Sequence, residues 1–178
     1  NFNIFEFTKA TFGNSLYYLG VYIINSAGLN NYFKLDERSL CKFFNQVELS
    51  YHPSSYHNNI HGADVLQTMF LLLEKSKIKN NLSQAELLSA YIAAAVHDVD
   101  HPGVNNSFLV RTYHPLATLY NDRSVLESHH AATAFKIATD SDCDIFSCFS
   151  SEQYTEIRKM IIDIIIATDM SLHFKYIN

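Results

Sequence analysis

Hydrophobic residues recur along most of this chain at the three- and four-residue spacing of amphipathic α-helices. The helices predicted from this spacing and from helix-start signals cover residues 12–25, 36–47, 56–73, 83–96, 115–120, 124–130 and 150–169. Most of the polar and glycine-containing segments between them are short. The pattern therefore predicts an all-α fold of seven or eight helices.

Residues that cap helix N-termini mark four of the predicted starts. Asp36 has the position of an N-cap, and Ser83–Glu86, Ser124–Glu127 and Ser150–Gln153 have the spacing of a capping box, in which two side chains satisfy the first backbone N–H groups. The isoleucine-rich stretch of the last helix is also compatible with a buried strand, but its charged lead-in favours a helix. Asp163 lies inside this apolar stretch and needs a partner.

Length and composition indicate one domain, residues 1–178, with a large core. Of the 178 residues, 48% are hydrophobic and 13% aromatic, with only 5 Gly and 3 Pro. The net charge of -5 provides no basic surface for a nucleic-acid backbone, so nucleic-acid binding is excluded. The three cysteines form no C-x-x-C pair, and no apolar stretch predicts a membrane span, which together predict a cytoplasmic protein.

The densest group of metal-binding residue types follows the most apolar predicted helix. Residues 87–96 are apolar at nearly every position, which predicts a helix buried on all sides. His97, Asp98, Asp100 and His101 follow at once. A buried carboxylate needs a cation or several hydrogen bonds. One alternative is that His97 caps the helix while Asp98 and Asp100 form a solvated turn, but four such residues in five positions favour a metal site.

A second pair of histidines lies in the helix predicted for residues 56–73. His57 and His61 are four residues apart, so on a helix they share one face and would point into one cavity. This spacing is common in helices that bind nothing. The alternative is one structural and one exposed histidine.

Taken together, these motifs resemble the catalytic domain of class I cyclic nucleotide phosphodiesterases. The stretches that carry the resemblance are Tyr56-His57-Asn58-x-x-His61, His97-Asp98-x-x-His101-x-x-x-x-Asn106, Leu126-Glu127-Ser128-His129-His130 and Ala167-Thr168-Asp169. Residues 10–12, 105–109, 126–132 and 173–178 are most similar to the high-affinity, cAMP-specific, inhibitor-insensitive branch. The resemblance implies a compact, all-α, HD-type fold that hydrolyses a 3',5'-cyclic nucleotide, cAMP before cGMP, to its 5'-monophosphate.

The resemblance also implies a binuclear metal centre. His61, His97 and Asp98 would bind the tighter ion, Zn²⁺, and Asp98 would also reach a second ion, Mg²⁺ or Mn²⁺. A hydroxide between the two ions would attack the phosphorus, which agrees with two-metal chemistry in general. His57 would be the general acid that protonates the departing 3'-oxygen.

Six further residues receive roles from the resemblance alone. Those expected to hold metal-bound water or to orient metal ligands are His101, Glu127 and Asp169. Those expected to shape the substrate pocket are Asn106, Thr168 and Met170. The capping-box position of Glu127 gives that residue a structural explanation as well.

The sequence departs from the family pattern in two ways. Gly62 stands where the family usually has alanine, which costs a helix up to about 1 kcal/mol. The family's later metal-binding Asp and its purine-binding Gln and Phe have no counterpart, so the domain is expected to be truncated at its C-terminal side. Two alternatives to the phosphodiesterase therefore stay open: a catalytically incomplete metal-binding fragment that acts as an interaction module, and a different His-Asp phosphohydrolase. The oligomeric state is left open.

Overall fold

The structure, a computed structural model, describes residues 2–177, so Asn1 and Asn178 of the predicted domain lie outside it. Within this range the regular secondary structure is entirely helical, which confirms the predicted all-α class. The helices are α1 (Ile4–Ala10), α2 (Ser15–Ser26), α3 (Leu29–Phe33), α4 (Glu37–Leu49), α5 (Asn59–Lys75), η1 (Lys77–Asn81), α6 (Gln84–Val96), α7 (Asn106–Arg111), α8 (Pro115–Leu119), α9 (Val125–Ala138), α10 (Ser151–Ile166), η2 (Met170–Leu172) and α11 (His173–Ile177). The short helices α1, α3, α7 and α11 and the 3-10 helices η1 and η2 were not predicted.

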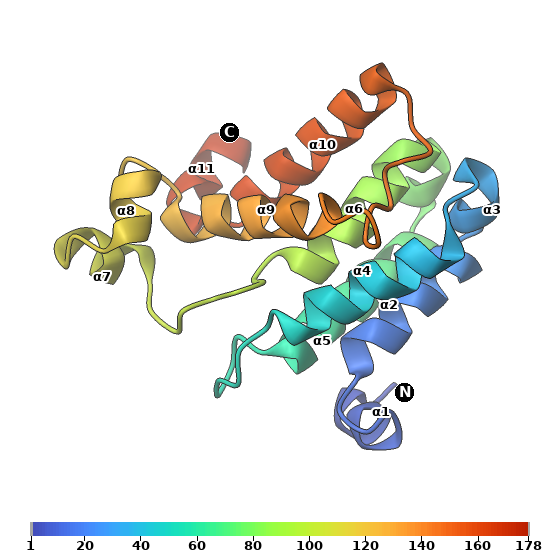
Figure 1. Cartoon of the computed structure of the whole chain (residues 1–178), viewed down its shortest axis with the longest axis horizontal. Helices are drawn as coiled ribbons and strands as arrows, with labels where there is room; N and C mark the ends of the chain where they lie inside the picture. The colour runs from blue at the N-terminus through green and yellow to red at the C-terminus, as the bar shows by residue number, and fades with distance from the viewer. Residues whose placement is uncertain (1, 178) are drawn as a thin grey trace.

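Helix α6 lies at the centre of the fold. It packs against α2 and α5 on one side and against α9 and α10 on the other, as Figure 1 shows. From Leu87 to Val96 every residue except the half-buried Ala90 is buried, which confirms that this helix has no polar face. The chain that leaves its C-terminal end therefore starts inside the protein, close to α5 and α9.

Two capping boxes and one N-cap predicted from the sequence are present. Ser83 with Glu86 caps α6, Ser150 with Gln153 caps α10, and the Asp36 carboxylate accepts the N–H of Ser39 at the start of α4. Helix α10 includes the isoleucine-rich stretch, so the helical interpretation is confirmed. Its Asp163 is exposed and pairs with Lys159 one turn earlier, at 2.5 Å.

The buried carboxylate of Glu48, on α4, joins this helix to α2 and α5. Its Oε2 accepts the backbone N–H of Tyr17 at 2.8 Å and its Oε1 accepts from the Asn59 side chain at 2.6 Å. Helix α2 starts at Ser15 rather than residue 12, because Phe12 and Gly13 adopt positive φ angles. The local N-cap residue of α2 makes no side-chain hydrogen bond to the helix, and Glu48 of α4 takes over this capping role. Glu48 also holds the first turn of α5 through Asn59.

A smaller group of buried side chains lies apart from the main core. Leu109, Ala117, Val125 and Leu126 come from α7, α8 and the start of α9. In Figure 1, α7 and α8 extend away from the other helices. None of the helices within residues 2–177 is both long and apolar enough to cross a membrane.

Candidate metal centre

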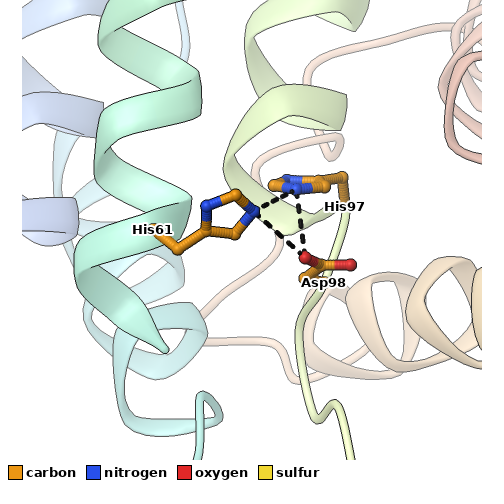
Figure 2. A group of neighbouring side chains, drawn as sticks. All are labelled: His61, His97 and Asp98. Carbon is orange, nitrogen blue, oxygen red and sulfur yellow. Dashed lines mark hydrogen bonds and ion pairs between the residues drawn. The ribbon is translucent and has the colours of Figure 1, made fainter. Parts of the chain in front are cut away.

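Three side chains predicted to bind metal converge where α5 meets the end of α6. His61 Nε2 lies 3.1 Å from His97 Nε2, and each of these nitrogens lies 3.2 Å from Asp98 Oδ2. Figure 2 shows the two imidazole rings and the carboxylate pointing toward one another. The structure therefore brings together the three residues named for the tighter metal, although they are up to 37 positions apart in sequence.

Local structure orients each of these side chains. His97 is the C-cap of α6, and its Nδ1 donates to the carbonyl of Ala94 at 2.9 Å, which directs Nε2 toward the centre. His61 lies in the first turn of α5. The Asn58 side chain caps that turn by accepting the N–H groups of Ile60 and His61 at 3.0 and 3.1 Å.

The donor set fits a zinc ion. Zn²⁺ with bonds of about 2.0–2.1 Å in a tetrahedron has ligand atoms about 3.3 Å apart. The three observed separations, 3.1 to 3.2 Å, are close to that value. The side chains are 13–17% exposed, so the group is largely shielded from solvent.

The electrostatics of the centre follow from burial and pairing. Burial raises the pKa of Asp98, but hydrogen bonds from His61 and His97 and the nearby histidine charges lower it by more, so the net pKa lies well below its ordinary value. Burial lowers the pKa of His97, yet its hydrogen bond to Asp98 and the negative charge there leave the net pKa raised. Asp98 is therefore ionised, as a metal ligand requires.

A second donor group shares Asp98. Asp98, His101 and His130 also offer donor atoms that lie close together, and His130 Nε2 is 3.7 Å from Asp98 Oδ1. His130 Nδ1 donates to the carbonyl of Val99 at 2.7 Å, while His101 Nδ1 accepts the N–H of Gly103 at 2.9 Å. No role was predicted for His130 from the sequence. The only signal was its place in the His129-His130 pair of a recognised motif.

His130 predicts how the stability of the metal-free chain depends on pH. Burial lowers its pKa from 6.5 to about 4, so between these values the unfolded chain binds more protons than the folded one. Lowering the pH from 6.5 to 4 should therefore reduce the free energy of unfolding by about 3 kcal/mol through this residue. The raised pKa of His97 has the opposite effect on stability, because the folded chain then binds more protons at this residue than the unfolded chain does.

Urea denaturation in EDTA at several pH values measures this effect. His130→Asn keeps an N–H donor for Val99 but cannot titrate, so its stability should fall less than that of the wild type over the same interval. Identical pH slopes for the two proteins would contradict the assignment.

His57 lies beside the donors but outside the helix. Helix α5 starts at Asn59, so the predicted start at residue 56 is wrong, and so is the argument that His57 and His61 share a helical face. The reason is the cap formed by Asn58, which ends the loop just after His57. The ring of His57 instead stacks on His101, with centroids 3.8 Å apart and planes 8° apart, and lies 6.1 Å from the His61 ring. His57 therefore lies next to the candidate metal centre because it stacks on His101, and not because it shares a helical face with His61.

Asn106 and Glu127 form one hydrogen-bonded unit at the start of α9. The Asn106 amide donates to Glu127 Oε2 at 2.9 Å and accepts the N–H of Leu126 at 2.9 Å. Burial raises the pKa of Glu127. The capping box predicted at Ser124–Glu127 is wrong, because Ser124 has φ 40° and its side chain accepts no helix N–H. Asn106 caps α9 from α7 in its place.

The remaining predicted residues lie around the end of α10. Asp169 is buried, its Oδ2 accepts from Ser124 Oγ at 2.7 Å, and its Oδ1 accepts the N–H of Ser171. The Thr168 hydroxyl donates to the carbonyl of Ile165 at 2.7 Å, and Met170 is 73% exposed. No hydrogen bond between described residues joins Thr168 to the metal donors. The pocket roles of Asn106, Thr168 and Met170 stay predictions.

Asp100 anchors the loop that follows the candidate metal donors, a role that was not predicted from the sequence. Its φ is 61°, its Oδ1 lies 2.5 Å from His52 Nε2, and its Oδ2 lies 2.8 Å from His129 Nε2. Its N–H donates to the carbonyl of Ser50 at 3.0 Å. The loop is thereby fixed to the segment before α5 and to α9. Nothing local in the sequence indicates that these partners meet.

The family, sequence and structure comparisons all match this chain to cyclic nucleotide phosphodiesterases. Residues 56–178 match the family described as 3'5'-cyclic nucleotide phosphodiesterase. The whole chain is 43% identical to the "High affinity cAMP-specific and IBMX-insensitive 3',5'-cyclic phosphodiesterase 8A" of mouse and of human, covering 22% of each. It is 39% identical over 171 residues, 96% of this chain and 25% of the relative, to the "Probable 3',5'-cyclic-AMP phosphodiesterase pde-4" of Caenorhabditis elegans.

A solved structure is similar as well. The phosphodiesterase domain of the RhoPDE fusion protein from the choanoflagellate Salpingoeca rosetta superposes with a TM-score of 0.86 at 34% identity, covering 90% of this chain and 50% of that one. This chain therefore spans about half of that solved domain and about a fifth of its mammalian relatives.

Proposed function

Because this chain belongs to the 3'5'-cyclic nucleotide phosphodiesterase family, we propose that it supplies the metal-binding part of an enzyme that hydrolyses a 3',5'-cyclic nucleotide to the 5'-monophosphate. The observation that carries the proposal is the triangle of His61, His97 and Asp98 at the junction of α5 and α6. The names of the mammalian relatives support cAMP as the first substrate to test, with cGMP second. Residues 1–178 would be the N-terminal and middle part of one catalytic domain.

Two divalent ions would occupy this centre. His61, His97 and Asp98 would hold Zn²⁺, and the other oxygen of Asp98 is available to Mg²⁺ or Mn²⁺. Such ions would supply Lewis acidity, lowering the pKa of water and offsetting negative charge on the phosphodiester. The low pKa of Asp98 keeps its carboxylate ionised, the state in which it can bind a cation.

The chain's own residues would move the proton and orient the substrate. We assign His57 as the general acid for the departing 3'-oxygen, since it borders the centre without being one of its donors. His101 would hold the His57 ring by stacking. Glu127, fixed by Asn106, and Asp169, fixed by Ser124, would accept hydrogen bonds from water around the second ion.

A second candidate is a metal-binding helical module that lacks activity. This candidate is favoured because the carboxylates of Glu127 and Asp169 already have hydrogen-bond partners. Glu127 accepts from Asn106, and Asp169 accepts from Ser124. Neither belongs to a group of converging metal donors among the described residues. A cytoplasmic location is proposed in either case, supported by the free thiols of Cys41, Cys143 and Cys148.

One experiment separates the two candidates. The purified chain is titrated with Zn²⁺ and then assayed for hydrolysis of cAMP and cGMP with Zn²⁺ and Mg²⁺ present. We expect metal-dependent hydrolysis of cAMP that EDTA abolishes and that added metal restores. Stoichiometric Zn²⁺ binding without turnover would favour the inactive module, and failure to bind Zn²⁺ would refute both.

A further inference from the structure

The phenol of Tyr51 is inserted into the end of α6, where no role was expected for it. Tyr51 is buried, with 6% of its surface exposed, and lies in the segment between α4 and α5. Its hydroxyl donates to the carbonyl of Ala95 at 3.0 Å and accepts the N–H of Asp98 at 3.4 Å. One oxygen atom therefore contacts the backbone on both sides of His97.

These contacts complete the buried C-terminus of α6. The last carbonyl groups of a helix have no partner within the helix, and buried ones need a partner elsewhere. Here the carbonyl of Ala94 accepts from His97 Nδ1, that of Ala95 from Tyr51, and that of Val96 from the N–H of Val99. In a continuing helix, backbone N–H groups would bind the carbonyls of Ala94 and Ala95. Here the side chains of His97 and Tyr51 bind them and so hold the turn that carries His97 and Asp98.

The same ring also packs against α5, the helix that carries His61. A Cβ atom at Gly62 would lie 3.0 Å from both Cζ and Oη of Tyr51. The absence of a side chain at Gly62, the position noted as a departure from the family pattern, lets the phenol lie directly against the backbone beside His61. Burial, followed by the charge of Asp98, raises the pKa of Tyr51, so its hydroxyl stays protonated and able to donate.

From this geometry we infer that Tyr51 is a positioning residue for the candidate metal centre. Its hydroxyl fixes the backbone of Ala95 and Asp98, and its ring sets the distance between the end of α6 and the start of α5. The inference rests on the proposed function, since it concerns how well the donors bind metal. Partners that orient metal ligands typically change affinity by 10–100-fold, and Tyr51 acts through the backbone, so about 10-fold is expected.

The test compares two tyrosine variants, each lacking one buried oxygen atom. Tyr51→Phe removes the hydroxyl described above. Tyr91→Phe is the matched control, because Tyr91 lies fully buried on α6 and its hydroxyl has no hydrogen-bond partner among the described residues. We expect Tyr51→Phe to raise the Kd for Zn²⁺ about 10-fold and to change the visible spectrum of the Co²⁺-substituted chain, while Tyr91→Phe leaves both as in the wild type.

A second readout needs no metal. In EDTA, Tyr51→Phe should accelerate hydrogen exchange of the Asp98 amide, and Tyr91→Phe should not. If the wild type bound no Zn²⁺, the proposed function would fail while this measurement still tested the positioning. Unchanged exchange at Asp98 in Tyr51→Phe, or equal changes in the two variants, would overturn the inference.

Discussion

Replacing Asp98 by Ala is expected to weaken Zn²⁺ binding by about 10²–10³-fold and to abolish metal-dependent hydrolysis. Structural zinc sites bind with about 10–16 kcal/mol in total, so each of the four ligands of such a site accounts for about 2.5–4 kcal/mol. Asp98 is expected to contribute more than an average ligand, because its carboxylate also belongs to the second donor group with His101 and His130. Loss of this one side chain removes an oxygen from both groups.

Isothermal titration with Zn²⁺, run beside the hydrolysis assay, measures both effects. The control is Asp163→Ala, since Asp163 is an exposed aspartate whose one ion pair within residues 2–177 is with Lys159 on α10, so the Kd should stay unchanged. Asp98→Asn separates charge from shape, because it keeps the size of the side chain. Full occupancy by Zn²⁺ in Asp98→Ala would show that this carboxylate is not a ligand.

The parts of the centre that the sequence predicted are those determined by local signals. The buried character of α6 follows from an apolar stretch, its start from Ser83 and Glu86, and its end from the polar residues after Val96. His97 and Asp98 are adjacent in the chain, so their proximity required no tertiary information. For these residues the local preference and the final packing agree.

The errors lie where a distant residue replaces a local cap. The capping box predicted at Ser124 was wrong because the side chain of Asn106 accepts the backbone N–H of Leu126 instead. Asn106 lies 20 positions before Leu126 in the sequence. The start of α2 was displaced in the same way, with Glu48 of α4 accepting from Tyr17. Partners of this kind depend on how helices pack, and no spacing within one segment encodes them.

The positions of Tyr51 and Asp100 were unpredictable for a related reason. Each residue binds groups that are distant from it in the sequence: Tyr51 binds the end of α6, and Asp100 binds His129 of α9. Asp100 does so with a positive φ, which non-glycine residues seldom adopt. His57 is a mixed case. The family pattern predicted that it borders the metal centre, and the structure agrees, but the helical spacing offered as the reason was wrong because Asn58 starts α5 later.

His57→Ala should slow hydrolysis of cAMP by about 10²–10⁴-fold, the usual contribution of a positioned acid. The Kd for Zn²⁺ should change little, because His57 is not among the converging donors. His61→Ala provides the contrast: that variant should lose both turnover and metal, since His61 Nε2 lies 3.2 Å from Asp98 Oδ2. Loss of Zn²⁺ in His57→Ala would instead make His57 a ligand.

The leaving group of the substrate tests the acid role directly. The 3'-oxygen of a cyclic nucleotide is a poor leaving group and needs a proton, whereas the p-nitrophenolate of bis(p-nitrophenyl) phosphate leaves without one. The wild type and His57→Ala should therefore differ greatly with cAMP and little with the nitrophenyl ester. Equal losses on both substrates would mean that His57 acts by positioning, through its stack on His101, and donates no proton.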